Sequence, residues 1–311
     1  MLISCGDALV DFVPTRNAQG REAVMPAVGG SCLNVAIGLA RLGAPTGFVG
    51  GISTDMFGRM IADHAAASDV DLNLATRSDH QTTLAFVRIV EGESHYAFYD
   101  SETATRNWTY RRGTVPFAHV EAVHVGSTTL VNDRGAAETM ALIEDARASS
   151  TISFDPNCRP NLIKDKPAYL ARMAEFAGRA DLIKMSNVDF AYLFGEEPYE
   201  QRANAMLRRG TSLVVITRGR DGAVAWHAGT GRIEVAAPKV EVADTIGAGD
   251  SFQAALLFAL YKQGRLAREK LGGIGADELR RSLSFAANCA VLTCTRPGAD
   301  PPWSHDVGGD W

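Results

Sequence analysis

Residues 242–261 read VADTIGAGDSFQAALLFALY, and this stretch decides how the rest of the chain is interpreted. In its first half, a run of β-branched residues ends in a turn with glycines at 247 and 249. Its second half is rich in strong helix formers and is apolar almost all round. The pattern predicts a turn that leads into a buried helix, with residues 247–250 at the helix N-terminus. Backbone N–H groups have no intrahelical partner there, so the turn is suited to bind an anion such as phosphate.

Asp250 places a carboxylate beside this predicted anion site. If a phosphoryl group binds there, the carboxylate can accept the proton of an attacking hydroxyl, while backbone donors stabilise charge on the transferring group. Asp is also favoured as a capping residue at helix starts. The local pattern alone therefore leaves a purely structural role open.

The longer string DTIGAGDSF at 244–252 resembles the C-terminal signature of the ribokinase-like (PfkB) sugar kinases. The resemblance implies that Asp250 is the catalytic base. It also implies that the backbone amides of Gly247, Ala248 and Gly249 form the anion hole, and that ATP is the phosphoryl donor.

Composition narrows the class of protein before any further motif is considered. The chain has 311 residues, 46% of them hydrophobic and 22% charged, which is ordinary for a soluble globular protein. A net charge of −5 and the lack of long basic runs argue against nucleic acid as a partner. Five cysteines without a C-x-x-C pair, no zinc-ligand spacing and no long apolar run favour a cytoplasmic enzyme with no membrane partner.

Residues 2–10 are predicted to form a buried first strand, and Asp11 follows it. An acid at the carboxyl end of a strand in an open α/β sheet lies where ligands bind, although Asp11 could equally be a turn residue before Pro14. In the sugar kinases an acid at this position binds sugar hydroxyls. The resemblance thus makes Asp11 a candidate sugar ligand.

A glycine pair at 29 and 30 opens an expected amphipathic helix that ends at Gly43. Asn34 lies in its first turn, where a side-chain amide could simply satisfy backbone groups. The spacing GGxxxNxAxxxxxLG resembles the other signature of the sugar kinases. This likeness implies that Gly29, Gly30 and Asn34 hold the sugar.

Two segments interrupt the βα rhythm and predict a small separate sheet. Residues 82–90 and 94–99 are β-rich and flank Glu91-Gly92-Glu93, as in an antiparallel hairpin. With residues 12–28 they would form a lid that closes over a substrate and excludes water. One face of 95–99 could cover the sugar or form a contact between two copies in a homodimer; the pattern does not separate these.

Further candidates come from the ends of later strands. Arg159 follows a predicted strand; it could be structural, by pairing with nearby acids, or part of the substrate side. Where the family usually has Asn-x-x-Glu near the metal and phosphates, this chain has Ser186 and Asp189, and the shorter acid can still recruit Mg²⁺ through water. Thr217 and Gly219 match the family's nucleotide loop.

In the family the last helix and the turn near 296–298 border the adenine and a monovalent cation. The resemblance therefore nominates Asn288 for the nucleotide and Asp244 for a cation such as K⁺. The tail from Asp300 is rich in Pro and Gly and is expected to be irregular.

Taken with the alternation of strand and helix patterns, the resemblance predicts one three-layer ribokinase-like α/β domain over residues 1–311. Its sheet is mostly parallel, and lid segments at about 12–28 and 80–111 are inserted into it. The strings YAFYD at 96–100 and DPNCRPN at 155–161 look most like bacterial fructokinases. The expected activity is ATP-dependent phosphorylation of fructose, with 2-keto-3-deoxygluconate, ribose or a nucleoside as alternative acceptors.

Two other functional classes, a dinucleotide oxidoreductase and a sugar sensor, are less consistent with the sequence. A dinucleotide oxidoreductase would need G-x-G-x-x-G after the first strand, and the sequence there does not supply it. A sugar sensor without turnover would not need a base, and the presence of Asp250 therefore favours catalysis.

Overall fold

The computed structural model describes residues 1–90, 93–267 and 269–308, and within these ranges the central element is a nine-stranded sheet. Its strand order is β15-β14-β13-β12-β11-β10-β1-β4-β6, with the strands from β13 to β6 parallel and β14 and β15 antiparallel. The strands are β1 (Leu2–Cys5), β4 (Thr46–Val49), β6 (Val70–Asp71), β10 (Ala122–Gly126), β11 (Thr151–Asp155), β12 (Leu182–Ser186), β13 (Leu213–Thr217), β14 (Ala223–His227) and β15 (Gly231–Val235).

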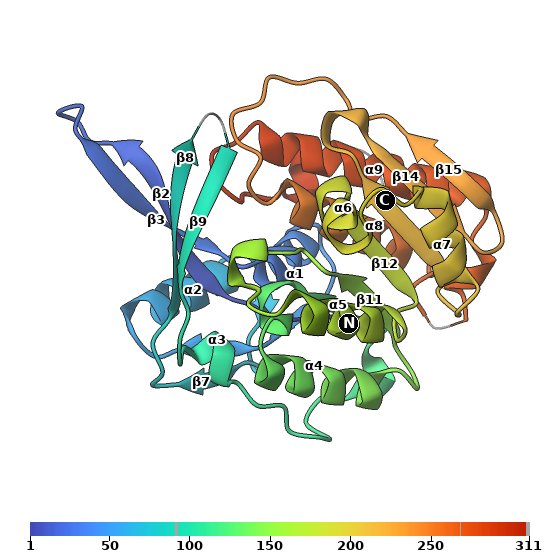
Figure 1. Ribbon diagram of the computed structural model, residues 1–311, viewed down its shortest axis with the longest axis horizontal. Coiled ribbons are helices and arrows are strands. Elements are labelled where there is room, and N and C mark those ends of the chain that lie inside the picture. The colour runs from blue at the N-terminus through green and yellow to red at the C-terminus, as the bar shows by residue number, and fades with distance from the viewer. Residues whose placement is uncertain (91–92, 268, 309–311) are drawn as a thin grey trace.

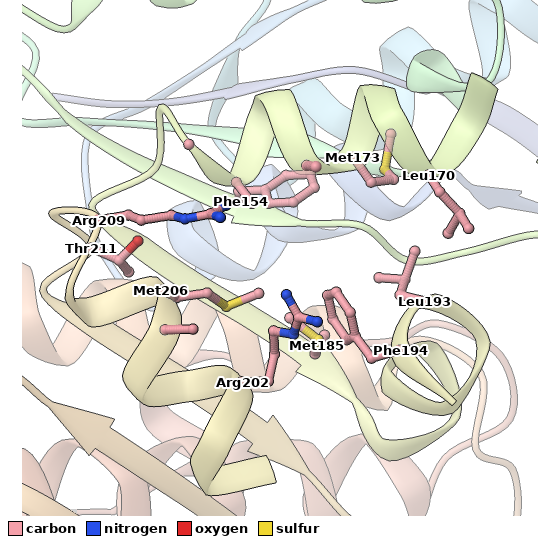
Figure 2. Close-up of a pocket in the computed structure, with 14 residues that line it drawn as sticks. Phe154, Leu170, Met173, Met185, Leu193, Phe194, Arg202, Met206, Arg209 and Thr211 are labelled. Carbon is pink, nitrogen blue, oxygen red and sulfur yellow. The ribbon is translucent and has the colours of Figure 1, made fainter. Parts of the chain in front are cut away.

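One face of this sheet is covered by a layer of four helices (Figure 1). They are α4 (Asp133–Ala146), α5 (Lys166–Ala177), α6 (Asn187–Phe194) and α7 (Tyr199–Leu207). Strand side chains such as Phe154 and Met185 point into this layer and pack with it (Figure 2). Among the helices described, none is long and apolar enough to span a bilayer.

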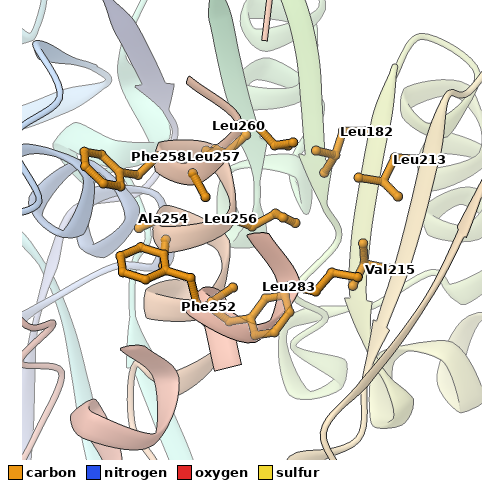
Figure 3. Packing of buried hydrophobic residues seen from close by; sticks show 14 of the residues in the cluster. Leu182, Leu213, Val215, Phe252, Ala254, Leu256, Leu257, Phe258, Leu260 and Leu283 are labelled. Carbon is orange, nitrogen blue, oxygen red and sulfur yellow. The ribbon is translucent and has the colours of Figure 1, made fainter. Parts of the chain in front are cut away.

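The other face is covered by α1 (Ser31–Arg41), α8 (Ala248–Lys262) and α9 (Ala276–Cys294). Helix α8 lies between α1 and α9, which themselves pack on the sheet, and residues 250–260 of α8 are buried. Figure 3 shows part of this packing. Leu256 packs with Leu182 and Leu213 of the sheet in one apolar cluster. These layers confirm the predicted mostly parallel α/β architecture, and the buried α8 explains why its sequence is apolar all round.

A second sheet stands away from the central one, in blue and teal in Figure 1. In the described residues it has the order β3-β2-β8-β9. Its strands are β2 (Leu9–Arg16), β3 (Glu22–Gly29), β8 (Thr83–Val90) and β9 (Glu93–Tyr99). We call it the lid sheet; the expected hairpin turn at 91–92 lies outside the described residues.

Further elements of the described residues lie beside the lid sheet. Strands β5 (Gly51–Ser53) and β7 (Thr76–Ser78) pair in parallel, while α2 (Met56–Ala66) packs against β2 and β3. The expected lid segment 80–111 extends past the lid sheet, because residues 104–107 form helix α3 (Ala104–Asn107).

The prediction of one continuous first strand over residues 2–10 was wrong. Strand β1 ends at Cys5, and the chain then enters the lid sheet as β2 at Leu9. Both apolar runs are buried, so their hydrophobicity gave no sign that they belong to different sheets. Asp11 therefore lies within a lid strand, and Asp7 is the acid that follows the central strand.

Candidate active site

A polar cavity of about 240 Å³ lies where the lid sheet meets the N-terminus of α8. It opens at the carboxyl ends of the central strands, the edge at which ligands bind in open α/β sheets. The lid sheet contributes Leu9, Asp11, Tyr96 and Phe98 to its lining. Among the residues predicted from sequence, the structure brings these to the cavity: Asp11, Gly30, Asn34, Arg159, Gly247, Gly249 and Asp250.

Asp250 is buried in the first turn of α8 and is held by two residues of α1. Ser31 Oγ donates a hydrogen bond to Asp250 Oδ1 at 2.6 Å, and Asn34 Nδ2 donates to Oδ2 at 2.9 Å. Burial raises the pKa of Asp250 to about 6, although both hydrogen bonds and the nearby Lys184 lower it. The carboxylate is thus fixed in orientation and ionised near neutral pH, as a general base must be.

The turn that the glycine spacing predicts is present before α8. Gly247 adopts the left-handed conformation with φ 75°, and a Cβ there would lie 2.7 Å from Ala299 Cβ. The amide of Ala248 donates to the Thr245 carbonyl at 3.3 Å. Within the described part of the chain, the amides of Gly249 and Asp250 have no acceptor, so they can donate to an anion in the cavity.

A buried ion pair behind this turn was not foreseen from the sequence. Lys184 Nζ lies 2.7 Å from Asp155 Oδ2 and donates to the Gly249 carbonyl at 3.1 Å, and both side chains are only 2% exposed. Burial disfavours the ammonium, but the Asp155 carboxylate outweighs this and raises the pKa of Lys184. A permanent positive charge therefore stands directly behind the anion-binding turn.

Asp7 is a second acid that sequence reasoning did not place in the site. Its Oδ1 accepts from the Cys32 amide at 3.0 Å, and its Oδ2 accepts from Ser127 Oγ at 2.8 Å and Thr128 Oγ1 at 3.0 Å. A Cβ at Gly30 would lie 2.6 Å from the Asp7 carbonyl, so the glycine permits the close approach of α1 to this loop. Asp7 therefore links the first turn of α1 to the segment at 127–128, and residues of both line the cavity.

Asp11 points from the lid sheet into the cavity. Burial raises the pKa of Asp11 to about 7, partly offset by the positive charge of Arg159, while Asp7 and Asp250 raise it further. A Cβ at Gly29 would overlap Asp11 Oδ2, so Gly29 provides room for the carboxylate. Arg159 donates to the carbonyls of Asn157 and Cys158 at 3.2 and 3.0 Å, which holds its side chain at the cavity wall.

Ser186 and Asp189 do not line this cavity. They form a capping box at the start of α6: Ser186 Oγ accepts from the Asp189 amide at 3.0 Å, and Asp189 Oδ2 accepts from the Ser186 amide at 3.2 Å. Ser186 Oγ also donates to Asp189 Oδ2 at 2.7 Å. Asp189 Oδ1 accepts from the Cys158 amide at 2.8 Å, so both carboxylate oxygens are engaged. This environment does not suit direct ligation of a metal ion by Asp189.

The other nucleotide candidates, Thr217, Gly219 and Asn288, do not line this cavity either. Thr217 ends β13, Gly219 has φ 55° in the following turn, and Asn288 is exposed on α9. Asp244 accepts from the amides of Ile246 and Gly298 at 3.0 and 2.9 Å, which ties the turn before α8 to the segment after α9. Among the described residues there is no cluster of three or more His, Cys, Asp or Glu side chains that could hold a metal.

Comparison with known proteins gives consistent matches across the chain. The model of the pfkB family carbohydrate kinases matches residues 1–306. A fructokinase of Rhizobium leguminosarum bv. trifolii is 36% identical over 280 residues, which cover 90% of this chain and 86% of that protein. The structure is similar to that of the fructokinase from Xylella fastidiosa with bound ATP, with a TM-score of 0.87, 26% identity, and coverage of 98% of this chain and 96% of that one.

A further solved structure carries ligands of interest. It is a double mutant of the fructokinase from Vibrio cholerae O395 with fructose, ADP and potassium ion bound. It has a TM-score of 0.83 and 27% identity to this chain, with coverage of 96% of this chain and 93% of that one.

Proposed function

This chain belongs to the pfkB family of carbohydrate kinases and is therefore a phosphotransferase that acts on a sugar hydroxyl, and we propose that it is an ATP-dependent fructokinase. The reaction is ATP plus D-fructose to ADP plus D-fructose 6-phosphate. The observation that supports it most is the Asp250 carboxylate beside unpaired α8 amides in a polar cavity under the lid sheet. The acceptor follows from the relatives, which are named fructokinases.

In the proposed mechanism the oxygen of the sugar hydroxyl bonds to the γ-phosphorus of ATP, and Asp250 accepts the proton of that hydroxyl. The bond between that phosphorus and the bridging oxygen of ADP breaks, and the amides of Gly249 and Asp250 stabilise charge on the transferring group. Ser31 and Asn34 keep the base aimed at the hydroxyl. At neutral pH the proton then leaves Asp250 to solvent, because the pKa of the carboxyl is about 6.

Asp11, Asn34 and Arg159 orient the sugar in this proposal, while Gly29 and Gly30 shape the wall beside it. Tyr96 and Phe98 of the lid sheet lie over the cavity and exclude water from it.

The nucleotide side is assigned to Ser186, Thr217, Gly219 and Asn288, which lie at or beyond the ends of β12, β13 and on α9. Mg²⁺, if bound with the nucleotide, would neutralise charge on the phosphate oxygens. Both oxygens of Asp189 accept hydrogen bonds from protein groups, so in this proposal Asp189 would hold the ion through water, as Mg²⁺ tolerates. Asp244 keeps the loop at 242–247 ordered for a monovalent cation.

The acceptor is tested by measuring ADP formation over a panel of fructose, ribose, 2-keto-3-deoxygluconate and adenosine. We expect kcat/KM for fructose to exceed that of each alternative by at least ~10-fold, because a hydrogen-bonding site discriminates strongly against poorly matched hydroxyls. A higher value for another acceptor would reassign the substrate within the family. If none of the tested acceptors leads to ADP formation, the kinase proposal is wrong.

At about pH 8, above the pKa of about 7 of Asp11, Asp11→Asn is expected to raise the KM for fructose by roughly 10–100-fold, because a hydrogen bond to an ionised group contributes about 1.5–3 kcal/mol. The KM for ATP should remain close to that of the wild type, since Asp11 belongs to the lid side of the cavity. Glu22→Gln, an exposed change on β3 of the same sheet, is the matched control. An unchanged fructose KM in Asp11→Asn would leave Asp11 with a structural role only.

We also propose that two copies of the chain associate through the outer face of the lid sheet. Phe12, Phe86 and Tyr99 form a continuous aromatic cluster there, with Tyr99 64% exposed. Exposed apolar area of this kind is typical of an interaction site. Sedimentation should give a dimer mass for the wild type and a monomer mass for Tyr99→Arg; a monomeric wild type at micromolar concentration would contradict the proposal.

A further inference from the structure

A second cavity, of about 210 Å³, lies on the other side of the central sheet from α8 (Figure 2). Its walls come from β11, β12, α5, α6 and α7 and are mainly apolar. The side chains that decide this character are Phe154, Met173, Met185, Leu193, Phe194 and Met206. Among the residues that the structure describes, no acidic side chain lines it, so it does not share the chemistry of the sugar cavity.

Two arginines line this cavity, Arg202 in α7 and Arg209 just after it, and their contacts differ. Arg202 is paired with Glu197, with Nε donating at 3.0 Å, and its guanidinium lies 4.4 Å from the centre of the Phe194 ring. The exposed Arg209 side chain has no ion pair in the described ranges, and Figure 2 shows it extending toward Phe154. One positive charge is thus available beside an apolar volume.

The size and charge of the cavity define a ligand class. A dry apolar cavity of ~150 Å³ is large enough for benzene, so this cavity has room for a ring and a short chain. A guanidinium binds a carboxylate through two parallel hydrogen bonds. We propose that the cavity is an effector site for a small amphipathic carboxylate of roughly ten non-hydrogen atoms, with its ring among the methionines and its carboxylate on Arg209.

The strands that form the floor of this cavity also carry residues that face the catalytic side of the sheet. Phe154 lines the cavity and is followed on β11 by Asp155, while Met185 lines it and follows Lys184 on β12. Neighbouring residues of a strand point to opposite faces. A ligand that shifts Phe154 and Met185 would therefore move the Asp155–Lys184 pair, and with it the Gly249 carbonyl.

Binding is tested by calorimetry on the intact protein without sugar or nucleotide, so this result does not depend on the proposed kinase function. The probe is 3-phenylpropanoate, with 3-phenylpropan-1-ol as its uncharged match and propanoate as the match without a ring. We expect a Kd of about 0.1–1 mM for the probe, and at least ~10-fold weaker binding of both matches. No heat of binding from the probe at millimolar concentration would overturn the proposal.

Variants separate this cavity from other binding surfaces. Arg209→Gln should weaken the probe by ~10-fold and leave the alcohol unchanged, whereas Arg208→Gln, at an exposed arginine outside the cavity lining, should change neither. Ala205→Leu and, as a second filling variant, Ala177→Leu should abolish binding of both. Wild-type affinity in a filled variant that remains folded by circular dichroism would place the ligand elsewhere and overturn the assignment.

The coupling is tested by steady-state kinetics and rests on the proposed function. The probe is expected to change kcat or the KM for ATP by at least ~2-fold in the wild type and in Arg208→Gln, and not in Ala205→Leu. If the probe binds without any kinetic change, the effector role is wrong, although binding measured by calorimetry would still support the site itself.

Discussion

Asp250→Asn is expected to slow phosphoryl transfer by at least ~10²-fold while the protein remains folded and binds sugar. The amide cannot accept the hydroxyl proton, but it is almost the same size as the carboxylate and keeps an oxygen for the hydrogen bond from Ser31. Single-turnover rates measure the transfer step, and equilibrium dialysis with labelled fructose measures binding. Wild-type turnover in this variant would remove Asp250 from the role of base.

The pH dependence of the wild type provides an independent readout of the same carboxylate. Its kcat/KM should fall as the pH decreases through about 6, because the pKa of Asp250 is raised by burial to about 6 and only the ionised form accepts a proton. Asp11, with a pKa raised by burial to about 7, titrates nearby, so the profile is compared with that of Asp11→Asn. Ser31→Ala removes one hydrogen bond to the carboxylate and should move the Asp250 limb to higher pH.

Stability gives the control against misfolding. The pKa of Asp250 is higher in the folded chain than the value of about 3.9 for an unperturbed Asp. Its contribution to stability is therefore fully present below about pH 4 and is lost as the pH rises through about 6. At about pH 8 the ionised wild type bears this cost and Asp250→Asn does not, so the variant's Tm should be no lower than that of the wild type. A large loss of both Tm and activity would point to misfolding instead.

The parts of the site that could be predicted from sequence are those whose chemistry is local. Gly247 and Asp250 belong to one turn, and the requirement for a left-handed residue before a helix N-terminus can be read within a few positions. Asn34 was identifiable for the same reason, because it lies in the first turn after a glycine pair. In each case the residues that define the feature are neighbours in the chain.

The parts that could not be predicted depend on which strands become neighbours. Lys184 and Asp155 lie on adjacent strands but are 29 residues apart, so the spacing along the chain does not reveal the ion pair. One signal was available: a lysine inside the apolar strand LIKMS of a parallel sheet has to be buried, and a buried lysine needs an acid. Asp11 was chosen in place of Asp7, because the apolar runs on either side of Gly6 and Asp7 were interpreted as one strand, although they belong to β1 and β2.

Lys184→Met is expected to lower the free energy of unfolding by about 3–5 kcal/mol, because it leaves the Asp155 carboxylate buried without its positive partner. In a chain of this size the loss corresponds to a decrease in Tm of roughly 10 °C, measured by calorimetry. Methionine is close to lysine in length, so the expected effect comes from charge rather than from an empty cavity. A Tm close to that of the wild type would mean that the pair does not stabilise the fold.

The double variant Lys184→Met/Asp155→Asn separates the structural role of the pair from its role at the anion-binding turn. With both charges removed, most of the lost stability should return, because no buried charge is left unpaired. Turnover should nevertheless stay at least ~10-fold below wild type, since the Gly249 carbonyl has lost its donor and the positive charge behind the turn is gone. If the double variant instead turns over at the wild-type rate, Lys184 only offsets the buried charge of Asp155, and the backbone amides and Asp250 suffice for transfer.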